Sequence, residues 1–561
     1  MIIDSQLKIL SVVLLLISRK ASCLPRNSLF TLIRGGGSVD TPRRKPDWLD
    51  MDRETLQGYM ELAKQRHVDA VRKAEESYWC ASKGEPPPEI GEEILPFVHA
   101  YGITAPPTWS LPDFSHDFDV SNMIYVTQTP LFTKEECNRL VQLAETHFHG
   151  EWSTLPSGRY DVAGFWINSV PAVHEWFNDM LRRRLFPLLQ KQFPEFCTLQ
   201  DLVVDNAYLF KYTTETGRRT DVHTDSGCLS FTIALNGPEG YKGGGTWFQG
   251  LKNDNPVIEM AQGHVTVRPG GIRHCGQAVT EGVRYIIGGF CMHREKVEYV
   301  RMLIGLGTER SFEGDLKGAQ EALEAALVLN PKFDSAYANL ADVLQRMGND
   351  EKAQQVLEHC HFHVNRQNAE VSYSLGIIYL NKGEYEKCKS CMEVCLQVDD
   401  CDTDAMMGMA QACSGQGDRD GEQEWYQRLV TTPGVADKTA AAAYCNWGVL
   451  NEGSDKEISF YEKGLELEPD HFTLRFSLAS AQAAQKSWPQ AAENFRMALD
   501  LCKSDPQMQS QALAALYRVA VIMVQSEFQA NPASQAAMLE RLQTIMGKDN
   551  YAQLAASRGQ G

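Results

Sequence analysis

Apolar side chains recur with two different periods along this chain, and the change of period divides it. Between about residues 118 and 296, short runs alternate apolar residues with small or polar ones and are separated by glycines and polar turns. Alternation with a period of two is typical of β-strands. We expect strands at 202–212, 229–235, 245–248, 264–267 and 283–291. Many short strands at this spacing predict a β-sandwich or a jelly-roll barrel.

Helical spacing of apolar residues appears before and between these strands. It extends over residues 50–82 and again over residues 173–189. A further helix is expected to begin at Thr133, because Glu136 three residues on completes the spacing of a capping box.

From about residue 300 onward, the pattern is helical and it repeats. The pairs Leu306-Gly307, Leu340-Ala341, Leu375-Gly376 and Met409-Ala410 lie 34 or 35 residues apart. Twelve residues after the second member of the first three pairs comes a small residue, and four further on comes a large one: Ala319, Ala353 and Cys388, then Leu323, Leu357 and Met392. The fourth unit departs from this pattern, with Glu422 at the small position. Small residues allow two helices to touch, and large ones fill the gaps between pairs. The alternative is a helical bundle without repeats.

This spacing resembles the tetratricopeptide repeat, in which each unit is a pair of antiparallel helices. We expect six units within residues 297–505, with capping helices and a tail over 506–561. Stacked pairs form concave surfaces suited to polypeptides, so the resemblance implies a polypeptide substrate or a partner protein.

The N-terminal region has the sequence pattern of a targeting segment followed by a linker. Residues Ile9–Ile17 form an apolar run that is too short to span a bilayer but suits the core of a signal peptide. We therefore expect a signal peptide over 1–23 and a secretory-pathway protein of the endoplasmic reticulum lumen. No stable membrane insertion is expected unless this segment is retained as an anchor. Residues 24–117 read as a linker with one helix and two proline-rich segments.

The net charge and the cysteine content limit which classes of partner and cofactor the sequence favours. The formal net charge is −18, which disfavours binding to nucleic acid. Three of the 15 cysteines, at positions 388, 391 and 395, fall on one helical face. They suit the small buried positions of a repeat, since free cysteine packs as a small apolar residue. A zinc or redox role is the alternative.

Candidate chemistry lies at His223, Asp225 and His274. Residues i and i+2 of a strand or its edge point to one side, so His223 and Asp225 can bind one ion together. His274 would come from a later strand. Two histidines and one carboxylate leave three coordination positions open, which suits Fe(II) chemistry with a cosubstrate and O₂.

Two neighbouring strands support this site. Ser230, Thr232 and Ala234 form a small, partly polar face that would line a cavity, while the residues between them are bulky and apolar. Arg284 lies within a strand-like run, and a buried arginine requires an anion. A dicarboxylate cosubstrate supplies one, held in a bidentate fork.

Residues 118–296 resemble the Fe(II)/2-oxoglutarate oxygenases of the prolyl 4-hydroxylase and lysyl hydroxylase type. The matching stretches begin at His223, Leu229, Tyr241 and His274. The resemblance implies an α+β multidomain chain in which a double-stranded β-helix (jelly-roll) oxygenase domain precedes the all-α repeat solenoid. It places Fe(II) on His223, Asp225 and His274, with no catalytic residue beyond these ligands.

The same resemblance assigns the cosubstrate. It places the distal carboxylate of 2-oxoglutarate on Arg284 and implies hydrogen bonds to the cosubstrate from Tyr212 and Thr232. It also implies O₂ as substrate and L-ascorbate as reductant.

Two departures leave the substrate open. The repeats follow the catalytic domain here, whereas they precede it in collagen prolyl hydroxylases, and Thr220-Asp-Val222 replaces the apolar or aromatic residue usual before the His-x-Asp. The main hypothesis is hydroxylation of a peptidyl proline or lysine. The alternatives are an oxygenase for a small molecule, with repeats used for assembly, and an inactive oxygenase fold serving as an adaptor.

Overall fold

The computed structural model describes residues 49–81, 95–103, 122–150, 152–153, 162–194, 196–214, 219–220, 222–225, 227–502, 505–530 and 535–558. The predicted signal peptide over residues 1–23 and the proline-rich segments at 86–88 and 106–107 lie outside these ranges. Among the described residues, no helix combines the length and the apolar character needed to cross a membrane.

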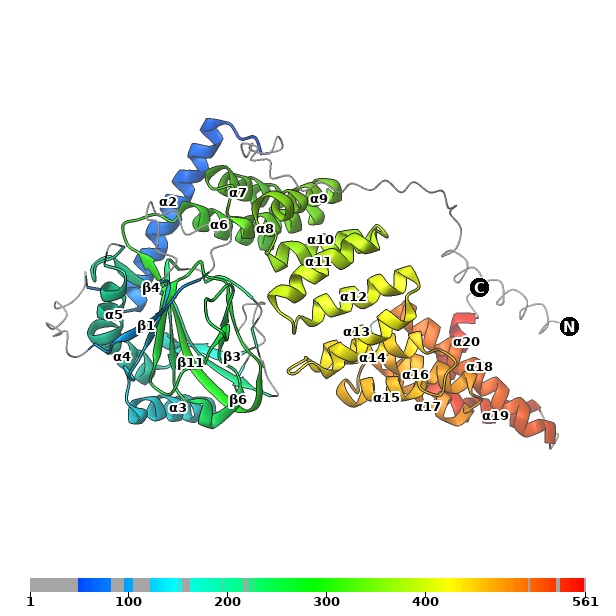
Figure 1. Ribbon diagram of the computed structural model, residues 1–561. Coiled ribbons are helices and arrows are strands. Elements are labelled where there is room, and N and C mark those ends of the chain that lie inside the picture. Colours follow the sequence, from blue (N-terminus) through cyan, green and yellow to red (C-terminus); the bar gives the residue numbers. More distant parts are fainter. Residues whose placement is uncertain are drawn as a thin grey trace. The chain divides into compact units, whose positions relative to one another are not determined.

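The β-rich region consists of two antiparallel sheets (Figure 1). The large sheet has the order β1 (Val98–Tyr101), β2 (Ile124–Thr127), β9 (Val265–Pro269), β5 (Leu229–Ala234), β11 (Val279–His293), β4 (Leu202–Thr213) and β3 (Ala163–Trp166), with β6 (Tyr241–Gly243) paired to β11. The small sheet has the order β10 (His274–Gly276), β7 (Thr246–Phe248) and β8 (Val257–Ile258). Strands therefore lie in every run where alternation predicted one, whereas the jelly-roll topology stays a prediction.

Helices cover one face of the large sheet, as Figure 1 shows for α3 (Lys134–Phe148), α4 (Pro171–Met180) and α5 (Phe186–Gln192). A π-helical turn, Leu181–Leu185, joins α4 to α5. The capping box predicted at the start of α3 is confirmed, because Thr133 and Glu136 exchange side-chain hydrogen bonds with each other's backbone.

The two faces of β5 differ as the alternation predicted. Leu229, Phe231 and Ile233 are buried in the core shared with the covering helices. The other face, with Ser230 and Thr232, points away from that core, and the buried polar residues of β9 lie beside it in the same sheet. The large sheet therefore has one apolar face that holds the helices and one partly polar face that is available for a site.

Two elements of the predicted linker belong to the folded core. Helix α2 (Arg53–Ser77) buries Tyr59, Ala63 and Val71 and packs against both β4 and the first helix of the repeat region. Strand β1 forms the edge of the large sheet. The sheet thus begins ahead of residue 118, and the reason is tertiary: both elements are stabilised by partners far away in the sequence.

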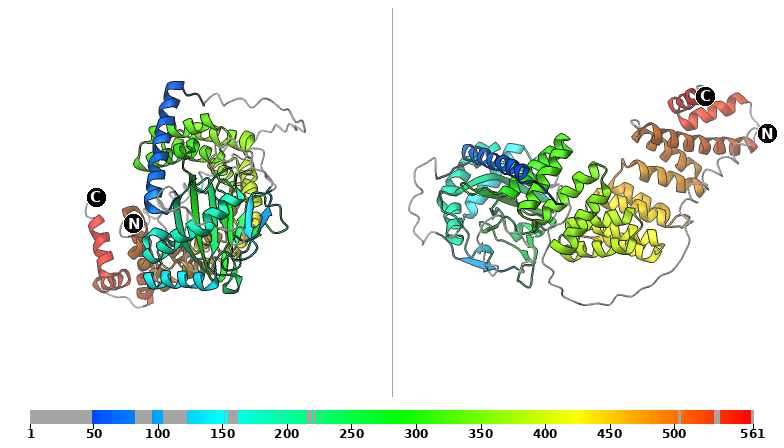
Figure 2. Two further views of the ribbon diagram at one scale, coloured as in Figure 1. Left: turned by 90° about the vertical axis from the view of Figure 1, so that its left-hand side faces the viewer. Right: turned by 90° about the horizontal axis from the view of Figure 1, so that it is seen from above.

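The described residues from 299 onward form six consecutive pairs of helices, followed by three further helices. Figure 2 shows this series of helices from two further sides. The pairs are α6 (Tyr299–Glu313) with α7 (Leu316–Leu329), α8 (Asp334–Arg346) with α9 (Asp350–His359), α10 (Ala369–Asn381) with α11 (Tyr385–Val398), α12 (Thr403–Gln416) with α13 (Arg419–Thr431), α14 (Asp437–Leu450) with α15 (Glu457–Leu467), and α16 (Phe472–Ala484) with α17 (Trp488–Leu501). After them come α18 (Pro506–Ala530), α19 (Gln535–Met546) and α20 (Lys548–Arg558).

The repeated small and large residues pack as the period predicted. Ala319, Ala353 and Cys388 are fully buried, as are Leu323, Leu357 and Met392. The fourteen described cysteines form no disulfide with one another, and all but Cys401 are buried. Burial raises the pKa of Cys391 to about 12, which keeps its thiol protonated and favours packing over metal binding.

Two glycines of α6 provide a test of this packing. A Cβ added at Gly307 would lie 2.7 Å from Cγ of Leu323, whereas one at Gly305 would meet nothing closer than 3.7 Å. We expect Gly307→Ala to destabilise the repeat region by about 1–3 kcal/mol through overpacking. Gly305→Ala is expected to stabilise it by about 0.5–1 kcal/mol, because alanine loses less backbone entropy in a helix. Thermal unfolding midpoints measure both, and equal midpoints for the two variants would contradict the close contact.

Candidate metal centre

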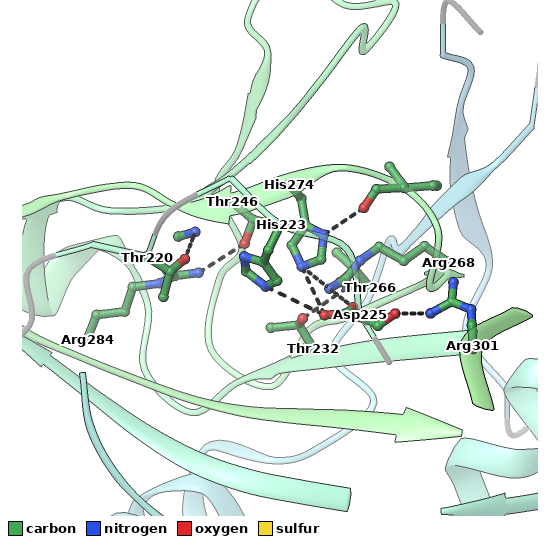
Figure 3. Close-up of polar contacts among 12 residues, drawn as sticks. Thr220, His223, Asp225, Thr232, Thr246, Thr266, Arg268, His274, Arg284 and Arg301 are labelled. Carbon is green, nitrogen blue, oxygen red and sulfur yellow. Dashed lines mark hydrogen bonds and ion pairs between the residues drawn. The ribbon is translucent and has the colours of Figure 1, made fainter. Parts of the chain in front are cut away.

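Two histidines and one aspartate converge at the start of β10 (Figure 3). His223 and His274 form an isolated antiparallel bridge, in which each backbone N–H donates to the other's carbonyl, at 3.0 and 2.9 Å. Asp225 lies two residues after His223, and its Oδ1 is 3.6 Å from Nε2 of His223 and 3.5 Å from Nε2 of His274. The three ligand atoms lie within 4.8 Å of one another, as ligands of one metal ion do.

The protonation of His274 suits a metal ligand. Its Nδ1 lies 2.9 Å from the carbonyl oxygen of Ile272, which only accepts hydrogen bonds, so Nδ1 carries the proton. Burial lowers the pKa of His274 to about 3, which keeps the imidazole neutral near pH 7. Nε2 therefore carries the lone pair, which in this structure accepts from Nη2 of Arg268 at 2.8 Å.

The carboxylate of Asp225 is kept ionised by its neighbours. Burial acts to raise its pKa, but the positive charges of His274 and Arg268 lower the pKa well below the usual range. Since His274 is neutral near pH 7, the permanent charge of Arg268 carries this effect there.

Arg268 on β9 reaches directly into the cluster (Figure 3). Its Nη2 donates to Oδ2 of Asp225 at 3.0 Å and to Nε2 of His274 at 2.8 Å. Only 3% of its side chain is exposed. Because Arg268 binds Oδ2, only Oδ1 of Asp225 faces the two histidines. This arrangement favours coordination of a metal through one carboxylate oxygen. Such outer-shell contacts orient metal ligands.

Arg268 was not predicted as a site residue. The expected strand ended one residue earlier, at Val267, although β9 extends to Pro269. The available signal was its position two residues after Thr266, on the same side of a strand that runs beside the polar face of β5. An arginine on this buried side of the strand requires an anion, and Asp225 supplies it.

Arg284 on β11 lies opposite Tyr212 on β4 in the sheet register. Its side chain is buried, Nη2 donates to Oγ1 of Thr246 at 3.3 Å, and its guanidinium carbon lies 5.3 Å from the centre of the Tyr212 ring. Nη1 is buried without a hydrogen-bond partner among the described residues. A buried guanidinium with a free donor fits the terminal carboxylate of a dicarboxylate ligand.

The other two residues predicted to contact the cosubstrate lie differently. Tyr212 is buried beneath Arg284, and burial raises the pKa of its phenol to about 12, so the hydroxyl stays protonated. Thr232 uses its hydroxyl as an acceptor from Nη1 of Arg268 at 3.1 Å. The structure thus brings Tyr212 to Arg284 and Thr232 to the metal side, while their roles stay predictions.

A row of aromatic rings continues the Tyr212 side of β4 to the edge of the sheet. The centre of the Tyr212 ring is 6.3 Å from that of Phe210, which is 5.5 Å from that of Tyr208. The Tyr208 ring lies 4.4 Å from Trp166 on β3, and Trp166 is 38% exposed. The row therefore leads from solvent to the buried guanidinium of Arg284.

The residues present fit the metal and the cosubstrate that the resemblance implies. Two imidazole nitrogens and one carboxylate oxygen form an incomplete coordination set of the kind that holds non-haem Fe(II). The unpartnered Nη1 of Arg284 supplies a site for a second carboxylate.

Comparisons with known proteins identify the repeats. Tetratricopeptide repeat models match residues 313–359, 369–400 and 460–506. Transcription factor tau subunit sfc4 of Schizosaccharomyces pombe is 32% identical over 123 residues, which cover 21% of this chain and 12% of that protein. A tetratricopeptide repeat protein from Parabacteroides merdae is similar in structure, with a TM-score of 0.31 and 20% identity over 39% of this chain and 84% of that one.

The middle region has a different set of relatives. A PKHD-type hydroxylase of Prochlorococcus marinus (strain MIT 9313) is 28% identical over 145 residues, which cover 26% of this chain and 55% of the relative. A PKHD-type hydroxylase of Rippkaea orientalis is 25% identical over 144 residues, which cover 24% of this chain and 60% of the relative. The chain thus spans only about half the length of these hydroxylases.

Tetratricopeptide repeats are modules for binding proteins, and the incomplete ligand set lies in the sheet region that precedes them. The chain therefore combines a tetratricopeptide repeat region with a middle region that is similar to PKHD-type hydroxylases.

Proposed function

We propose that this protein is an Fe(II)- and 2-oxoglutarate-dependent dioxygenase that hydroxylates a prolyl or lysyl residue of a polypeptide and releases succinate and CO₂. One observation carries the proposal: a two-histidine, one-carboxylate cluster shares a sheet region with a buried arginine that has a free donor. The similarity to PKHD-type hydroxylases supports the same reaction class.

Each side chain of the site has a part in this proposal. His223, Asp225 and His274 would hold Fe(II), which supplies O₂ activation together with 2-oxoglutarate. Arg268 directs one oxygen of Asp225 away from the metal side and balances its charge. Arg284 would bind the distal carboxylate, with the ring of Tyr212 packed against the guanidinium.

The aromatic row and the repeats support a polypeptide substrate. An apolar ring such as proline packs well on aromatic side chains, and the alkyl stem and ammonium of lysine also bind aromatic faces. Exposed Trp166 marks the solvent end of this row. The repeats would grip the remaining polypeptide.

The test is turnover of full-length, Fe(II)-loaded protein with 2-oxoglutarate, O₂ and L-ascorbate, the reductant that we also propose. Proline-rich and lysine-rich peptides are compared with the free amino acids. We expect peptide-stimulated succinate release and a mass gain of one oxygen on one peptide class. Succinate release that neither peptide stimulates would favour a small-molecule substrate. No metal binding and no turnover would favour an adaptor.

For localisation we propose the endoplasmic reticulum lumen, on the apolar run at residues 9–17 alone. Fluorescence microscopy of the full chain tagged at its C-terminus tests this. A diffuse cytosolic signal would contradict it.

A further inference from the structure

Each chain segment that carries a metal-cluster residue also contacts the repeat region. Arg219, four residues before His223, forms an ion pair with Asp399, which follows α11. Nη2 of Arg273, the residue before His274, lies 3.4 Å from Oδ2 of Asp334 at the start of α8. Arg301 on α6 donates through Nη1 to the backbone carbonyl of Asp225 (Figure 3).

The contact of Arg301 bears most directly on the metal cluster. Asp225 lies outside every strand, so no sheet ladder sets the direction of its carboxylate. Its backbone N–H donates to the carbonyl of Gly270 at 2.9 Å, and its own carbonyl accepts from Arg301. Arg301 thus restrains one end of the residue from the repeat side.

Arg301 is itself largely buried in the first repeat, beside a carboxylate. Only 9% of its side chain is exposed, and its Nε lies 3.1 Å from Oε2 of Glu298. Its guanidinium carbon lies 5.9 Å from the ring centre of Phe333, which caps α8. A buried guanidinium paired with a carboxylate cannot easily change its conformation. A movement of α6 would therefore move the guanidinium and, through its hydrogen bond, the backbone of Asp225.

The Arg273 contact forms a second, independent link. Asp334 also accepts from Nδ2 of Asn365 at 2.6 Å, which fixes its carboxylate within the repeats. The side chain of Arg273 is 7% exposed. Since Arg273 is the residue before His274, a movement of α8 would also displace the second histidine of the cluster.

We propose that the first two tetratricopeptide repeats are a structural part of the metal centre, with Arg301 as the positioning residue for Asp225. The inference rests on the proposed function, because it concerns the same metal. It goes further by making metal affinity depend on helices that contribute no ligand. Supporting contacts of this kind change metal affinity by about 10–100-fold.

The test is a Co(II) titration of the metal-free full chain, followed by the absorbance of the bound ion, with no turnover required. Arg301→Met is expected to weaken Co(II) binding at least ~10-fold. Arg310→Met is the matched control on the same helix, because Arg310 bonds to Tyr59 and Gly318 instead. We expect Arg310→Met to lower the thermal midpoint but to bind Co(II) as the wild type does.

Asp334→Asn serves as a second variant, because it keeps the shape of a partly exposed side chain and removes the charge of the Arg273 ion pair, while its amide oxygen can still accept from Asn365. We expect Asp334→Asn to bind Co(II) several-fold more weakly than the wild type. If Arg301→Met does not fold, this variant alone tests the inference. Wild-type affinity in both variants, or in Asp334→Asn when Arg301→Met does not fold, would overturn the inference and leave the proposed function intact. Absence of Co(II) binding by the wild type would overturn both.

Discussion

Replacing His223 with alanine is expected to abolish stoichiometric Fe(II) binding and to reduce succinate formation to background. Removal of the His223 imidazole leaves only Asp225 and His274 as ligands. Two protein ligands bind Fe(II) too weakly to compete with water at micromolar iron concentrations. His223 suits this test because its side chain is 15% exposed, whereas that of Asp225 is 1% exposed. Its loss therefore creates little buried cavity. Anaerobic Fe(II) titration and succinate detection measure the two effects.

The control for this variant is His264→Ala. His264 lies just before β9, and its Nδ1 is 2.7 Å from the carbonyl oxygen of Thr127, away from the three-residue cluster. We expect His264→Ala to bind Fe(II) and turn over like the wild type. Equal loss in both variants would indicate a general folding defect, and full activity of His223→Ala would refute the metal assignment.

Replacing Arg284 with leucine is expected to raise the KM for 2-oxoglutarate by about 10²–10³-fold, the effect of removing one partner of a buried charge pair. Among the described residues, the other arginine of the site, Arg268, already donates to Asp225 and Thr232. Initial rates of succinate release against 2-oxoglutarate concentration provide the measurement.

Two comparisons sharpen the Arg284 experiment. Arg284→Leu should bind Co(II) with wild-type affinity, because the guanidinium bonds to Thr246 and not to a metal-cluster residue. Tyr212→Phe keeps the ring beneath the guanidinium but removes the hydroxyl, so it separates packing from hydrogen bonding. An unchanged KM in Arg284→Leu would assign the cosubstrate carboxylate to another residue.

Much of the fold followed from local patterns. The strands around residues 202–212 and 229–235 were predicted from alternation, because a strand with one buried face repeats every two residues. The repeat helices followed from small residues such as Ala319 and Ala353, which recur because each helix pair solves the same packing problem. The strand signal lies within single elements, and the repeat signal lies in the spacing between them.

The candidate site was predicted only in part. His223, Asp225 and His274 were recognisable because a metal needs particular residue types, and the structure brings them together. The assignment of Thr232 to the cosubstrate stays a prediction, and in the structure its hydroxyl accepts from Arg268. A threonine on the inner face of a strand has several neighbours within reach, and the sequence does not rank them.

The sequence by itself determined the two-part organisation, the residue types of the metal cluster and the buried arginine that calls for an anion. Only the tertiary structure decided that Arg268 joins Asp225 across 43 residues, and that Arg301 reaches the Asp225 carbonyl across 76. It also decided that Arg219 meets Asp399 across 180 residues. The reason is physical: periodicity reports which face of an element is buried, whereas the partner of a buried charge depends on which distant elements the chain packs against that face.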